Sequence, residues 1–157
     1  MRHTLAPISE RSRMQLLITD SESLMEACFR LGDARFSLPN AVFDEAAGVW
    51  RGPFLREEFD EPALTSKREG RVFAKTTYPL YEAILELRGV KACSISDRSH
   101  IELYYFRFCE PVGDAVRLVF AEDMEITLTF DGAPRGGLAD VRLSEQVGTS
   151  WGLKGFA

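Results

Sequence analysis

The chain has 157 residues, of which 45% are hydrophobic and 27% are charged, and its formal net charge is −5 at pH 7. This length fits one domain that can bury a core without disulfides or metal ions. The acidic excess disfavours nucleic-acid binding, because phosphate contacts require a basic surface. No apolar run reaches the roughly 18 residues of a membrane-spanning helix, so we expect no membrane contact.

The N-terminal segment and the cysteines suggest a cytoplasmic protein. Residues 1–13 are polar, and we expect a flexible tail there, followed by a single globular domain over residues 14–157. The N-terminus lacks the apolar stretch of a secretory signal peptide. Cys28, Cys93 and Cys109 are widely spaced beside apolar residues, which favours buried thiols. A Cys93–Cys109 disulfide would be disfavoured in a reducing compartment.

One helix is predicted near the start of the domain. Thr19 and Glu22 have the spacing of a capping box, which marks a helix N-terminus. An apolar stripe at helical spacing follows: Leu24, Ala27, Cys28 and Leu31. These signals predict a helix over residues 20–31. The alternative is a hairpin that pairs residues 27–31 with residues 34–38.

Short alternating segments follow the helix. Residues 34–38 predict one strand, and residues 42–43 and 49–50 predict a hairpin. The Gly-Pro pair at 52–53 should place the second strand of that hairpin at a sheet edge, or bend it. Residues 56–70 are charged and lack periodicity, so we expect a long surface loop there.

The second half of the chain is predicted to form consecutive strands. Between residues 124 and 130 apolar and polar side chains alternate, as do those of residues 116–120, which predicts an antiparallel hairpin. Residues 101–109 are apolar on both faces, which is typical of a strand covered on both sides. We expect strands at 72–73, 81–88, 90–95, 101–109, 116–120, 124–130 and 138–143, a loop at 131–137 and a tail at 148–157.

The order of elements predicts an α+β fold that is mainly β. Regular strands with short turns give an antiparallel sandwich or a partly closed barrel, with the helix at about 20–31 packed on it. The tripeptide Gly48-Val49-Trp50 resembles the G-x-W signature of the lipocalins. That resemblance implies a barrel with a cavity for an apolar ligand, and it carries no ligand-binding residue over to this chain.

Asp97, His100 and Glu102 form the one close grouping of Asp, His and Glu. On a strand His100 and Glu102 share a face, so with Asp97 they would bind a divalent metal or act as a general acid and base. The alternative is an ordinary turn at 97–100 followed by a solvent-facing Glu102. We find no nucleophile motif, phosphate-binding loop or metal-ligand spacing, and therefore expect no cofactor and favour a protein that is not an enzyme.

A second group of candidate residues favours partner binding. Trp50 would provide an aromatic anchor, and the small basic cluster of Lys67, Arg68 and Arg71, at the end of the loop at 56–70, would provide charges. The alternative for these basic residues is a solvated loop. We therefore favour a non-catalytic protein-interaction module that binds another protein or a second copy of itself. The alternatives are a small barrel that binds an apolar ligand and, third, a metal-assisted hydrolase that uses Asp97, His100 and Glu102.

Overall fold

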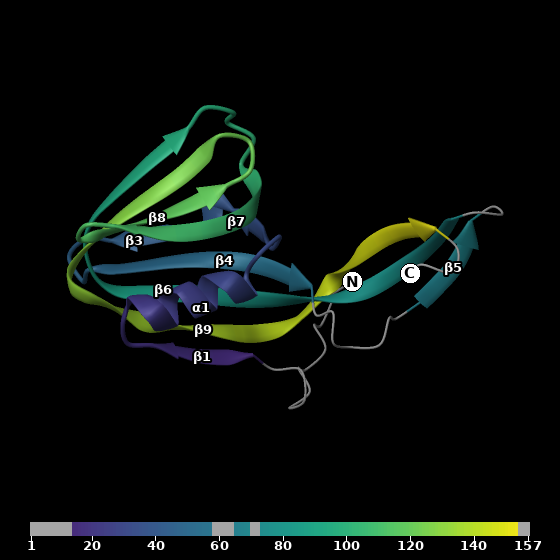
Figure 1. Ribbon diagram of the computed structural model, residues 1–157, viewed down its shortest axis with the longest axis horizontal. Coiled ribbons are helices and arrows are strands. Elements are labelled where there is room, and N and C mark those ends of the chain that lie inside the picture. Colours follow the sequence, from purple (N-terminus) through teal and green to yellow (C-terminus); the bar gives the residue numbers. More distant parts are fainter. Residues whose placement is uncertain (1–13, 58–64, 70–72, 154–157) are drawn as a thin grey trace, which may run out of the picture.

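The computed structural model describes residues 14–57, 65–69 and 73–153, with side chains described for residues 14–57 and 79–144. Most of these residues lie in strands, and one α-helix lies across the resulting barrel (Figure 1). The elements are β1 (Gln15–Ile18), α1 (Ser21–Arg30), β2 (Arg35–Ser37), the 3-10 helix η1 (Leu38–Asn40), β3 (Val42–Asp44), β4 (Val49–Glu57), β5 (Thr65–Glu69), β6 (Phe73–Asp97), β7 (Leu103–Val112), β8 (Ala115–Phe120) and β9 (Met124–Leu153).

The sheet closes into a barrel because the two long strands, β6 and β9, pair with each other as well as with their other neighbours. The order around the ring is β9, β8, β7, β2, β4 and β6, and neighbouring strands are antiparallel. Outside the ring, β1 pairs with β9, β3 with β4 and β5 with β6. The predicted mainly β fold with one helix is confirmed, and of the two predicted architectures the barrel is the one observed.

The hairpin predicted from alternation is present. Strand β8 pairs with residues 124–129 of β9, and the apolar set of each strand faces the barrel interior. Leu118 and Leu128 are both fully buried, at 0% exposure. Because alternate side chains of a strand point to opposite faces, the polar residues between them lie on the outer surface.

Helix α1 forms where the sequence predicts it, but its capping box lies one residue later. Asp20 is the N-cap: its carboxylate accepts a hydrogen bond from the backbone of Ser23, and the Ser23 hydroxyl accepts one from the backbone of Asp20. The apolar stripe of the helix packs on the barrel through Leu24, Ala27 and Cys28. Within the described residues, α1 falls short of the length and hydrophobicity needed to cross a bilayer.

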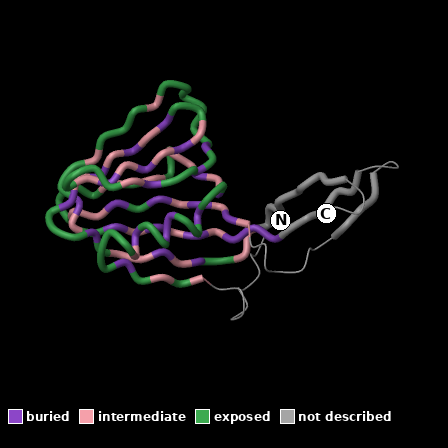
Figure 2. Tube along the Cα trace, in the orientation of Figure 1, coloured by how far each residue is buried: buried purple, intermediate pink, exposed green. Residues whose placement is uncertain are grey.

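Aromatic rings fill the interior of the barrel. Their centroids lie between 4.7 and 6.2 Å apart, and each side chain is at most 3% exposed. The five rings belong to Phe36, Trp50, Phe54, Phe106 and Phe120. Figure 2 shows how buried and exposed residues alternate along the strands that enclose this core.

The expectation that residues 101–109 are covered on both faces is wrong. In β7, Tyr104 and Phe106 point inward and are at most 1% exposed, whereas Leu103 and Tyr105 on the other face are each 52% exposed. The reason is closure: a strand with sheet neighbours on both sides in a barrel still has one face inside and one face outside. Apolar composition on both faces therefore indicates, here, an apolar outer surface.

The expected loop at 131–137 is also wrong, because strand β9 continues through it. Gly132 and Gly136 have φ angles of +85° and +152°, which alanine or larger residues rarely adopt. The pairing of β6 with β9 shifts register between Arg88 and Ala92, opposite this segment. The glycines thus bend a continuous strand and do not end it.

Two further boundaries differ from the sequence expectation. The loop expected at 56–70 contains the end of β4, at Glu57, and strand β5. The tail expected at 148–157 overlaps β9, whose backbone pairs with β6 as far as Leu153. The tail expected at 1–13 lies outside the described residues.

The Gly-Pro pair at 52–53 lies within the ring and not at its edge. Strand β4 pairs with β6 along its whole length. On its other side, β3 pairs with residues 49–51 and β2 with residues 54–55, so residues 52 and 53 lie between these two partners. A proline is tolerated at such a gap because its missing N–H has no partner to satisfy there.

Candidate functional site

Asp97, His100 and Glu102 lie at the connection between β6 and β7, and not on one strand face. Asp97 is the last residue of β6, and both other residues precede β7, which begins at Leu103. His100 and Glu102 have φ angles of +53° and +74°, in the left-handed region. The expected shared face of His100 and Glu102 is therefore wrong, because this backbone turns where an alternating strand was assumed.

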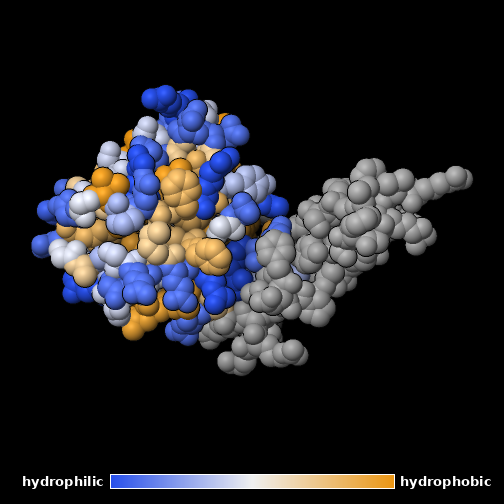
Figure 3. All heavy atoms as spheres, in the orientation of Figure 1, coloured by the Kyte–Doolittle hydropathy of each residue, from blue (hydrophilic) through white to orange (hydrophobic). Residues whose placement is uncertain are grey.

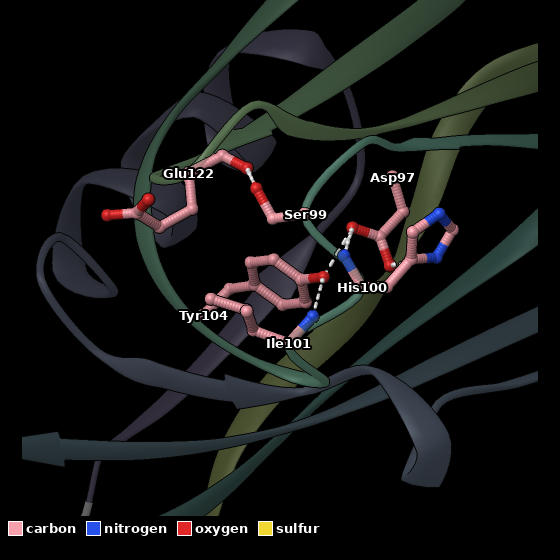
Figure 4. Close-up of polar contacts among 6 residues, drawn as sticks. All are labelled: Asp97, Ser99, His100, Ile101, Tyr104 and Glu122. Carbon is pink, nitrogen blue, oxygen red and sulfur yellow. Dashed lines mark hydrogen bonds and ion pairs between the residues drawn. The ribbon is translucent and has the colours of Figure 1, made fainter.

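A hydrogen-bond network holds this turn together (Figure 4). The Tyr104 hydroxyl donates to Asp97 Oδ1, and the backbone N–H of His100 donates to the same oxygen at 3.1 Å. Tyr104 Oη also accepts from the backbone N–H of Ile101 at 3.1 Å. The His100 ring is 82% exposed, with its Nδ1 3.9 Å from Asp97 Oδ2. Asp97 therefore acts as a cap for the turn, with the imidazole directed to solvent.

The same hydrogen bonds shift the pKa values of the two partners. The Tyr104 hydroxyl lowers the pKa of Asp97 below its usual value of 3.8 by donating to its carboxylate, and the His100 backbone adds to this. The pKa of Tyr104 is raised, first by its burial and then by its bond to Asp97. A carboxylate with a lowered pKa is a weak base at neutral pH, which disfavours a role for Asp97 as a general base.

These three residues do not form a metal centre in the structure. Within the part of the chain that is described, no three His, Cys, Asp or Glu side chains come together in a group that could hold a metal ion. The side chains of Asp97 and His100 approach each other, and the network above does not include Glu102. The geometry therefore supports a structural turn and gives the hypothesis of a metal-assisted hydrolase no support.

Replacing Tyr104 with phenylalanine is expected to raise the pKa of Asp97 toward 3.8, because the main hydrogen bond that favours the carboxylate is removed. With a lowered native pKa, Asp97 stabilises the fold fully above about pH 4, and this contribution is lost as the pH falls through the native pKa. The variant should therefore lose less stability on acidification. Carboxyl-carbon NMR titration of Asp97 checks the shift, and an unchanged Asp97 pKa would contradict the network.

The partner-binding candidates lie in different parts of the molecule. Trp50 is 1% exposed, and its ring stacks on Phe36 inside the barrel at a centroid distance of 6.2 Å. Trp50 therefore contributes to the core and presents no surface to a partner. Lys67 and Arg68 are residues of β5 whose side chains are outside the description, and Arg71 lies outside the described residues.

A groove of about 410 Å³ lies on the outer face of the barrel, across strands β7, β2, β4, β6 and β9. Its apolar side chains come from outward-facing positions of these strands, and two of them, Leu103 and Val141, are 52% and 48% exposed. The outward-facing apolar residues of the groove are Pro53, Leu55, Ile84, Leu103 and Val141. Figure 3 shows that hydrophobic side chains also lie among hydrophilic ones on the face it displays.

The rim of the groove is charged. Arg142 Nε lies 3.1 Å from Glu82 Oε2, so these two charges are paired. Arg35, on β2, has no carboxylate partner among the residues that the structure describes. Two arginines and one glutamate give the groove a local charge of +1 in a chain whose net charge is −5. The groove therefore combines an apolar floor with one unpaired cation.

Sequence reasoning missed this groove, although one signal for it was present. In residues 81–88 the outward set is Glu82, Ile84, Glu86 and Arg88, so Ile84 is an apolar residue on an otherwise charged face. An apolar residue at an outward position is informative only when its spatial neighbours are known. Those neighbours come from four other strands, which strand pairing and the closure of the barrel bring together.

Comparisons of the chain with family models, with curated proteins and with solved structures find no match.

Proposed function

We propose that this chain is a non-catalytic binding module that holds an extended segment of a partner protein in the groove on the outer face of its barrel. The observation that carries the proposal is the groove itself, with a partly exposed apolar floor and a charged rim. Protein interfaces combine the same two parts: apolar side chains at the centre and polar groups around them. Exposed apolar patches of this kind are typical of interaction sites.

The chemistry of the rim defines the partner segment. Arg35 has no carboxylate partner among the described residues, so an acidic residue of the segment would pair with it. The apolar floor, which includes Leu55 and Leu103, would bury aliphatic side chains. We therefore infer an extended segment that carries both aliphatic and acidic residues. Its aliphatic side chains, at alternate positions, would face the floor, and an acidic side chain between them would reach Arg35 at the rim.

The filled interior favours this proposal over an apolar-ligand barrel. The cavity implied by the G-x-W resemblance would have to lie where Phe36, Phe54 and Phe120 pack against one another. The three cysteines are free thiols, which supports a reducing compartment such as the cytoplasm as the place of action.

The proposal is tested with two fluorescent peptides, one alternating leucine with glutamate and one alternating leucine with lysine. We expect the Leu/Glu peptide to bind more tightly by about tenfold, or about 1.4 kcal/mol. The variant Arg35→Glu should reverse this preference, and Leu103→Glu should abolish binding of the Leu/Glu peptide. Fluorescence anisotropy measures each affinity.

Leu17→Glu is the matched control, because Leu17 is a 76% exposed leucine on β1 outside the groove. It should leave peptide binding unchanged. Equal affinities for the two peptides would overturn the proposal. An equal loss of peptide affinity in Leu17→Glu and in Leu103→Glu would overturn it as well. If light scattering shows a dimer that Leu103→Glu disrupts and Leu17→Glu does not, the groove binds a second copy of the chain and not a segment of another protein.

A further inference from the structure

Three sulfur atoms meet where helix α1 packs against strand β7. Cys109 Sγ lies 3.3 Å from Met25 Sδ and donates to it. The thiol of Cys28 lies beside that of Cys109, whose proximity, together with burial, raises the pKa of Cys28, and both cysteines are free. Cys28 is 2% exposed and Cys109 is 3% exposed, whereas Met25 is 40% exposed and lies at the surface end of the cluster.

The local structure explains why the three sulfurs converge. Met25 and Cys28 are three residues apart on α1, so they lie on neighbouring positions of one helix face. Strand β7 faces inward at Phe106, and strict alternation would direct residue 109 outward. A register shift between Phe106 and Phe108 inserts one extra residue and turns Cys109 toward the helix.

We propose that Met25, Cys28 and Cys109 form a binding site for monovalent copper. Two thiolates and one thioether are soft ligands, and soft sulfur ligands select Cu(I). On binding, Cu⁺ replaces the thiol protons of Cys28 and Cys109, and both protons pass to solvent. The copper keeps its oxidation state, so the step needs neither an oxidant nor a reductant.

The number of available ligands favours Cu(I) over zinc. Structural zinc sites use four ligands from Cys, His, Asp or Glu in tetrahedral geometry. Within the described residues, no group with as many as three such side chains is found, so Cys28 and Cys109 lack the further ligands that zinc requires. A three-sulfur set in which one member is methionine matches a soft cation of low coordination number.

The distances require a small adjustment on binding. Three sulfurs at about 2.3 Å from a shared metal ion lie about 4 Å apart when the site is planar. The 3.3 Å separation of Cys109 Sγ from Met25 Sδ must therefore widen by about 0.7 Å to reach that spacing. The unbranched side chain of Met25 can make this movement, and its exposure gives copper a route to the buried thiols.

The test titrates the reduced full-length chain, under anaerobic conditions, with Cu(I) held by bicinchoninate. We expect the chain to take one copper ion from the chelator, with sulfur ligands alone in the X-ray absorption spectrum. Cys28→Ser and Cys109→Ser should each remove this binding. Cys93→Ser is the matched control, since Cys93 is not part of the cluster, and should bind copper as the parent chain does.

Met25→Leu keeps the test informative if a serine variant fails to fold, because this 40% exposed position tolerates an apolar replacement of similar volume. This variant should bind copper more weakly, and the number of sulfur ligands should fall from three to two. Absence of copper uptake by the parent chain would overturn the proposal. Copper binding that Met25→Leu leaves unchanged, or that Cys93→Ser abolishes, would overturn it as well.

Discussion

Replacing Gly136 with alanine is expected to destabilise the protein by about 4 kcal/mol, a large part of the 5–15 kcal/mol of a typical domain. A Cβ atom at this position would lie 1.8 Å from the carbonyl oxygen of Glu86, on the neighbouring strand β6. The obstacle is backbone, so it cannot move aside as a flexible side chain would. Residue 136 also has a φ of +152°, which an alanine rarely adopts.

Gly113→Ala separates the two causes of this effect. Gly113 also has a positive φ, +63°, but a Cβ there would meet no described atom within 4 Å. Its replacement should cost only the backbone strain of about 1–2 kcal/mol. Urea unfolding of both variants measures the two losses. Similar losses would contradict the close approach of β9 to β6 at Gly136 and, with it, the pairing that closes the barrel.

The second large effect is expected when the buried ion pair between Arg56 and Asp140 loses one partner. Arg56 Nε donates to Asp140 Oδ1 at 2.7 Å, a second guanidinium nitrogen contacts Oδ2, and the side chains are 5% and 0% exposed. The backbone N–H of Met14 also donates to Oδ2, at 2.7 Å. Asp140→Asn should cost about 3–5 kcal/mol, because it removes a negative charge that is in direct contact with a buried guanidinium.

The double variant Arg56→Met/Asp140→Asn is the control for this prediction. It removes both charges and keeps an oxygen that can accept from Met14, so it should be more stable than Asp140→Asn alone. Chemical denaturation of the single and double variants gives the coupling energy. If the stability losses of Arg56→Met and Asp140→Asn simply add in the double variant, the two charges do not interact in the native state. That result would contradict the ion pair.

The local elements of the fold can be predicted from the sequence. Helix α1 has a cap and an apolar stripe within residues 20–31, and the β8–β9 hairpin has uninterrupted alternation. Both signals depend on residues close together in the chain. The cap was misplaced by one residue because Thr19 and Asp20 are both good N-caps, and only the backbone distinguishes them.

Features that depend on the pairing of distant segments could not be predicted from the sequence. The glycines of residues 131–137 are typical of a loop, but β6 provides a continuous partner that keeps β9 extended through them. Likewise, the apolar composition of residues 101–109 does not show which face a closed barrel leaves outside. In each case tertiary pairing, which no local window contains, decides the outcome.

The candidate sites also divide into features set by local sequence and features set by distant pairing. The sequence identified the turn at Asp97 and His100 but assigned it a possible chemistry, because the structural use of Asp97 depends on Tyr104 turning back toward it. The groove combines five strands, and the sulfur cluster depends on a bulge in β7 that places Cys109 beside α1. Neither arrangement has a sequence motif.

The most direct test of the binding proposal is an amide NMR titration of the chain with the Leu/Glu peptide. We expect shifts concentrated at the groove, at residues such as Arg35, Leu55 and Ile84, with β1 and β3 unchanged. Shifts concentrated instead along β1 or β3, each of which has a single partner strand, would show that the segment binds at a sheet edge and would contradict the groove as the binding site.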